Sequence, residues 1–67
     1  MTNPDDAEFF THFATAANDA EQRGDHVAHV HAVANAILEG PGTYAENGAT
    51  FRAERIRLGR RIEQMPQ

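Results

Sequence analysis

Two glycine-containing turns divide the 67-residue chain into three segments, and apolar residues recur within each at the three- and four-residue spacing of a helix. Arg23 places a positive charge near the last carbonyls of the first segment. Gly24 can adopt the left-handed backbone conformation that commonly ends a helix. Gly40-Pro41-Gly42 cannot continue a helix. The sequence therefore predicts one all-α domain, a helical hairpin followed by a third helix. The expected domain spans 1–67, with helices at approximately 4–23, 26–39 and 44–64.

Capping signals precede each expected helix. Asn3-Pro4-Asp5-Asp6 combines an N-cap side chain, a proline at the first helical position and two carboxylates near the positive end of the dipole. Asp25 can cap the second helix, and Thr43 with Glu46 fits a capping box for the third. Asn47-Gly48 is also a turn signal, so an alternative starts the third helix near residues 47–50. We favour the start at 44, because an apolar residue then recurs every seventh position.

The chain has little bulky apolar material for a core. Val, Ile, Leu and Phe number twelve of 67 residues, and twelve Ala supply nearly half of the 40% hydrophobic content. Such a short chain buries only about 60% of the surface that its unfolded form exposes. With no Cys, neither disulfides nor thiolate metal sites can stabilise it. We therefore expect oligomerisation.

The middle segment has no charged side chain between Asp25 and Glu39. Its larger apolar residues predict a core-facing stripe: Val27, Val30, Val33, Ala34, Ile37 and Leu38. The opposite side carries alanines at four-residue steps, which lets another backbone approach closely. The helix is therefore expected to be buried on two sides, either sandwiched within the domain or covered by another chain. We expect a protein partner, most simply a second copy, at Ala28, Ala32 and Ala36 of the second helix and Arg52, Ile56 and Arg60 of the third.

Arginine is concentrated at the C-terminal end. Residues 51–67 contain five Arg against two Glu, whereas residues 1–50 contain one Arg against eight acidic residues. A small nucleic-acid-binding regulator that uses this third helix is therefore the alternative function. The arginines scatter around the helix axis, however, and Glu54 and Glu63 lie three residues from Arg57 and Arg60. This pattern favours an ion-paired helix over one that reads a groove.

Four histidines are the most unusual compositional feature, and three fall in the sequence His26-x-x-His29-x-His31. His26, His29 and Asp25 could approach one cation, but His31 lies about 160° around the helix from His29. We therefore expect no metal. Protonation of the imidazoles would charge a helix expected to be buried, so stability is expected to fall in acid.

The sequence offers little for catalysis. It contains no Ser, no Cys and no Gly-rich phosphate loop, so we expect a non-enzymatic protein without a cofactor. There is no membrane-length apolar run, and the first residues lack the basic and apolar regions of a signal peptide. We expect a cytoplasmic regulator, adaptor or inhibitor. The exclusive use of Arg among basic residues and the abundance of Ala are typical of a high-GC bacterium or its phage.

Overall fold

Three helices account for all the regular structure of the described residues. The computed structural model describes residues 4–64, and it describes side chains from residue 5 to residue 59. The helices are α1 (Pro4–Arg23), α2 (His26–Glu39) and α3 (Tyr44–Gln64). The all-α prediction is confirmed, and the alternative start of the third helix near residues 47–50 is wrong.

The turn between α1 and α2 closes both helix ends within two residues. Gly24 adopts a left-handed conformation with φ of 70°. Its N–H donates to the Glu21 carbonyl at 3.1 Å, and the Asp25 N–H donates to the Ala20 carbonyl at 2.8 Å. These two bonds form a Schellman motif, which uses carbonyls that the helix leaves unpaired. The Asp25 carboxylate then accepts from the Ala28 N–H at 3.1 Å and caps α2.

A capping box begins α3 where the sequence predicts it. The Thr43 N–H donates to the Glu46 carboxylate, and the Glu46 N–H donates to the Thr43 hydroxyl, both at 3.1 Å. The bond from Thr43 lowers the pKa of Glu46, because it stabilises the ionised carboxylate.

The contacts of Asn47 explain why Asn47-Gly48, a sequence typical of turns, lies inside α3. The side chain of Asn47, which is only 2% exposed, reaches back from α3 to the end of α2. Its amide nitrogen donates to the carbonyls of Ile37 at 2.8 Å and Gly42 at 3.2 Å, and its oxygen accepts from the Gly42 N–H at 3.0 Å. A Cβ at Gly40 would overlap this amide, so glycine is required there. Asn47 therefore ties α3 to the C-terminal end of α2.

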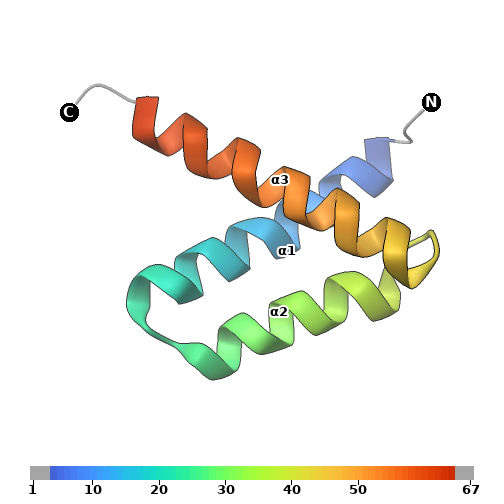
Figure 1. Ribbon diagram of the computed structural model, residues 1–67, viewed down its shortest axis with the longest axis horizontal. Coiled ribbons are helices and arrows are strands. Elements are labelled where there is room, and N and C mark those ends of the chain that lie inside the picture. The colour runs from blue at the N-terminus through green and yellow to red at the C-terminus, as the bar shows by residue number, and fades with distance from the viewer. Residues whose placement is uncertain (1–3, 65–67) are drawn as a thin grey trace.

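Figure 1 shows α1 and α2 as an antiparallel hairpin, with α3 returning from the 40–43 turn and crossing α1. Each helix packs against both others. The molecule measures 37 × 29 × 17 Å, so it is thin in one direction. None of the helices within residues 4–64 is sufficiently long and apolar to cross a bilayer.

Alanine dominates the core. Among the side chains of residues 5–59, Phe10 and Phe51 are the only bulky hydrophobic ones that are buried. The remaining buried hydrophobic residues are Ala14, Ala17, Ala20, Ala32 and Ala36. Phe9, Phe13, Ala16, Val33 and Leu58 pack against this core while partly exposed. Small side chains allow the helix axes to approach closely, so the alanines form the contact between helices.

The two faces of α2 are reversed relative to the prediction. The alanines at positions 32 and 36 are 5% and 0% exposed, whereas Val27, Val30 and Leu38 are 65%, 46% and 61% exposed. Only Val33 of the predicted stripe packs directly against the core cluster. The physical reason is steric: a helix that must fit closely against two neighbours presents its smallest side chains to them.

At 100° per residue, the sequence predicts a buried stripe on α1 with Phe10 at its edge and with Thr11 and Asn18 on the solvated side. This predicted stripe consists of Phe9, Phe13, Ala16, Ala17 and Ala20. The observed stripe is rotated from this one. Phe10, expected at the edge, is at the centre, and two residues expected to be solvated face α3 instead. Thr11 donates to the Glu54 carboxylate, and Asn18 bonds Arg55. The polar residues on this flank of α1 predicted that it is exposed to solvent. In the structure, α3 covers the flank and forms hydrogen bonds with it.

Substitutions around Asn47 test this account of the turn. Gly40→Ala and Asn47→Ala should each lower the free energy of unfolding by about 1–3 kcal/mol, because each disrupts the buried amide bonds. Gly48→Ala should raise it by about 0.5–1 kcal/mol, because its Cβ would meet nothing within 4 Å and alanine favours the helix. Thermal and denaturant unfolding measure all three. Additive effects of Gly40→Ala and Asn47→Ala in the double variant would contradict the shared contact.

Candidate interaction surface

The reversal of α2 leaves an apolar surface, here called the α2 outer face. It consists of exposed Val27, Val30 and Leu38 together with half-buried Ala34 and Ile37. At 100° per residue these five side chains fall within one 100° sector of the helix. Val27 and Leu38 are eleven residues apart, so the face is about 16 Å long. No Asp, Glu, Lys or Arg interrupts it.

The residues predicted to contact a partner do not form one surface. Ala32 and Ala36 are in the core and are not accessible to a partner in this arrangement, and Ala28 is half-buried. Arg52 and Ile56 are exposed on α3, where Ile56 has 45% of its surface accessible. The side chain of Arg60 lies outside the described residues. Partner binding at these positions remains a prediction.

Sequence reasoning missed the α2 outer face because a hydrophobicity scale ranks Val and Leu above Ala for the core. One signal was available. Val27, Val30, Ala34 and Ile37 have the alternating three- and four-residue spacing of a coiled-coil seam. The same helix also carries alanines at regular four-residue steps, so two of its faces suited helix packing.

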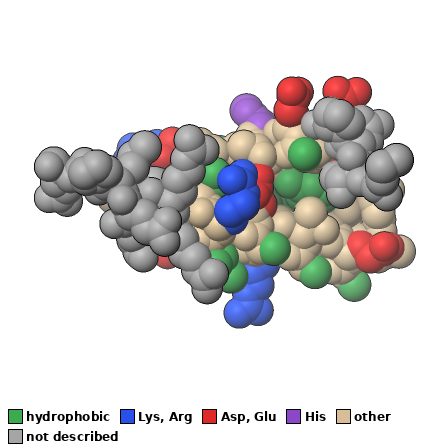
Figure 2. All heavy atoms as spheres, turned by 90° about the horizontal axis from the view of Figure 1, so that it is seen from above, with side chains coloured by type: hydrophobic (Ala, Val, Ile, Leu, Met, Phe, Trp, Pro, Cys, Tyr) green, Lys and Arg blue, Asp and Glu red, His purple; other side chains and the backbone are tan. Residues whose placement is uncertain are grey.

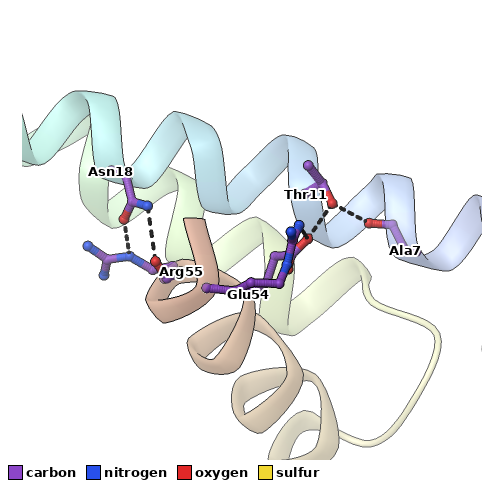
Figure 3. Close-up of polar contacts among 6 residues, drawn as sticks. Ala7, Thr11, Asn18, Glu54 and Arg55 are labelled. Atoms are coloured by element: carbon purple, nitrogen blue, oxygen red, sulfur yellow. Dashed lines mark hydrogen bonds and ion pairs between the residues drawn. The ribbon is translucent and has the colours of Figure 1, made fainter. Parts of the chain in front are cut away.

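Two of the described arginines of α3 are engaged with other helices or with carboxylates. Arg57 donates to Glu54 at 2.5 and 2.9 Å. Arg55 forms a hydrogen bond with Asn18 at 2.9 Å (Figure 3) and an ion pair with Glu21. In Figure 2, acidic side chains lie at the end where α1 begins, and a basic side chain near the middle lies beside an acidic one. These contacts do not give the described part of α3 a continuous basic surface.

Glu54 is the most enclosed carboxylate for which an ion pair is described. Its side chain is 15% exposed, against 56% for Arg57. The hydrogen bond from Arg57 is the main reason that the pKa of Glu54 lies below its ordinary value, and the bond from Thr11 adds to it, while burial opposes both. The same pair raises the pKa of Arg57. The Thr11 and Arg57 bonds thus hold an ionised carboxylate between α1 and α3 (Figure 3).

The histidines do not converge on a common point. Within residues 5–59, no group of three or more His, Asp or Glu side chains is arranged to hold a metal ion. His26, His29 and Asp25 line one hollow near the α1–α2 turn, together with Ala20, Glu21 and Gly24. One ring nitrogen of His29, however, lies 3.2 Å from a nitrogen of Arg55. A guanidinium donates hydrogen bonds only, and its charge opposes a metal ion at that nitrogen.

A second hollow, of about 460 Å³, lies between the start of α1, the 40–43 turn and α3. Phe10, Ala7 and Ala53 contribute apolar surface to it, and Glu46, Glu54 and Asn47 contribute polar groups. All three of these polar side chains already accept hydrogen bonds within the protein. Asp6, Thr50 and Arg57 also line the hollow, so three carboxylates and one guanidinium surround its apolar surface.

Comparisons of the chain with models of protein families, with curated proteins and with solved structures find no match.

The Glu54 contact makes stability depend on pH in strong acid. A carboxylate whose pKa is lowered on folding stabilises the protein above its unfolded pKa, and this contribution is lost as the pH falls. Glu54→Gln should lower the melting temperature near pH 7 and reduce the further loss below about pH 4. Glu8→Gln, on an exposed site of α1, provides the matched control in thermal unfolding. Equal acid sensitivity of the Glu54→Gln variant and the unsubstituted protein would rule out this role.

Proposed function

We propose that this chain is a non-enzymatic protein-interaction module that self-associates through the α2 outer face. The observation that supports it is the distribution of side-chain size, with bulky Val27, Val30 and Leu38 at the surface and alanine in the core. Fully burying one such side chain contributes about 1.5–3 kcal/mol. Helix packing on this face therefore supplies apolar burial that the monomer lacks.

A second copy of the chain suits this face by its charge and its spacing. Because the face carries no charge, a two-fold contact brings no like charges together along it. In an antiparallel pair with seam spacing, Val27 meets Ile37 of the partner subunit, and Val30 meets Ala34 of the partner subunit. Ala34 is small enough for the two helices to approach closely at the centre. The contact is thus self-complementary.

Arg52 and Ile56 form a separate exposed surface on α3 that could serve the same purpose. Nucleic-acid binding through α3 has less support, because Arg55 and Arg57 are engaged in ion pairs. Salt separates these alternatives. Phosphate contacts weaken steeply as salt rises, whereas apolar association barely responds.

Sedimentation over a range of about 1 μM to about 1 mM tests the proposal, since this range spans typical weak self-association. The unsubstituted chain should change from the monomer mass of 7.4 kDa to about twice that value, with little effect of salt. Val30→Ser combined with Leu38→Ser should remain monomeric, because it removes the exposed apolar contact, and should keep its helical content.

Ile56→Ser is the matched control, because it replaces an exposed apolar residue outside the α2 outer face. It should associate as the unsubstituted chain does. Loss of association in this variant alone would transfer the role to α3 and contradict the proposal. A monomer mass at the highest concentration of the unsubstituted chain would also contradict it.

A further inference from the structure

The hollow between the start of α1, the 40–43 turn and α3 has the size and the walls of a small-molecule site. Its volume of about 460 Å³ falls in the range of about 300–1,000 Å³ in which proteins bind small ligands. Most of its lining is apolar, with Ala7 and Phe10 from α1, Pro41 from the turn and Ala53 from α3. Phe10 belongs to the buried core cluster, so this wall is in place before a ligand binds.

The charged groups around this apolar surface are mainly negative. Asp6, Glu46 and Glu54 line the hollow with one guanidinium, that of Arg57. Arg57 is paired with Glu54, which also accepts from Thr11 of α1 (Figure 3). The positive charge of the lining is therefore already used, and two further carboxylates remain. Hydrogen bonds from Thr43 lower the pKa of Glu46, so this carboxylate is ionised at neutral pH.

Asp6 is the carboxylate with the most to gain from a ligand. It lies half-buried in the first turn of α1, where the helix dipole favours a negative charge. Among the residues that the structure describes, none donates a hydrogen bond to its side chain or forms an ion pair with it. Hydrogen bonds between charged partners are stronger than neutral ones. A cationic donor is therefore the group that Asp6 selects.

The apolar lining and the negative charge together exclude most kinds of ligand. An anion would be repelled, and a neutral apolar compound would remove water from the carboxylates without supplying a donor. A bare metal ion needs several converging oxygens, and no such group of three side chains is found within residues 5–59. A protonated amine with an apolar body satisfies both features, because its ammonium group has hydrogen-bond donors and no acceptor.

We propose that this hollow binds a small organic cation, a protonated amine whose apolar body packs against Phe10 and Ala53 and whose ammonium group donates to Asp6. Glu46 adds negative charge beside the ammonium group. Glu54 keeps its bonds to Thr11 and Arg57 and joins the two helices that form the walls. This binding is separate from self-association, since no residue of the α2 outer face lines the hollow.

NMR titration of the unsubstituted chain with phenethylamine at about pH 7 tests the proposal, because the amine is then protonated. Amide signals of the lining, including those of Ala7, Gly42 and Ala53, should shift and saturate with a dissociation constant of about 1 mM or below. Phenethyl alcohol, which lacks the charge, should bind at least about tenfold more weakly. Phenylpropionate, an anion of similar shape, should shift none of these signals.

Two variants with matched controls locate the site. Asp6→Asn should weaken phenethylamine binding by about three- to tenfold, because it removes the charge of the main acceptor. Glu8→Gln removes the same charge from an exposed position of α1 outside the hollow and should bind as the unsubstituted chain does.

Ala53→Leu fills the hollow without changing its charge and should abolish binding, whereas Ala45→Leu, at an exposed position of α3 outside the lining, should retain it. Ala53→Leu should still self-associate in sedimentation, so the two proposals can fail separately. No saturable shift with phenethylamine up to about 10 mM would overturn the inference. Equal binding of phenylpropionate, or unchanged affinity in both Asp6→Asn and Ala53→Leu, would overturn it as well.

Discussion

Close packing of alanine between the helices is the constraint on which the rest of the structure depends. Ala14 and Ala17 of α1 and Ala32 and Ala36 of α2 belong to one buried cluster with two phenylalanines. Alanine loses no side-chain entropy on folding and allows backbones to approach, so these contacts favour both helix formation and packing. They bury little apolar area per residue, however. The larger aliphatic side chains of α2 are displaced to its other face, where a second chain can cover them.

Polar contacts between the helices supplement the packing of the alanine core. Asn47 joins α3 to the end of α2, Glu54 joins α3 to the first half of α1, and Arg55 joins α3 to the second half of α1 and to α2. Each of these contacts lies at the edge of the core and depends on one or two side chains. In a chain with so few bulky residues, such bonds add to the burial of Phe51 in fixing the position of α3.

The sequence alone predicted where the three helices begin and end, but it did not predict which face of α2 is buried. Gly24, Asp25 and the Thr43–Glu46 box act through bonds between neighbours in the chain, so spacing alone identified them. The inward face of α2 depends on the shapes of α1 and α3, which no local pattern contains. A preference for Val over Ala therefore selected the wrong side. Asn47 was interpreted as a turn residue because its role depends on carbonyls that only the folded chain brings near it.

The most direct test is the accessibility of methyl groups on α2, measured by NMR with a dissolved paramagnetic agent. In dilute protein, the methyls of Val27, Val30 and Leu38 should be strongly broadened, while those of Ala32 and Ala36 should be protected. At high protein concentration, the Val and Leu methyls should become protected as well. Protected Val and Leu methyls beside broadened Ala methyls in dilute solution would contradict the arrangement of α2 on which the account rests.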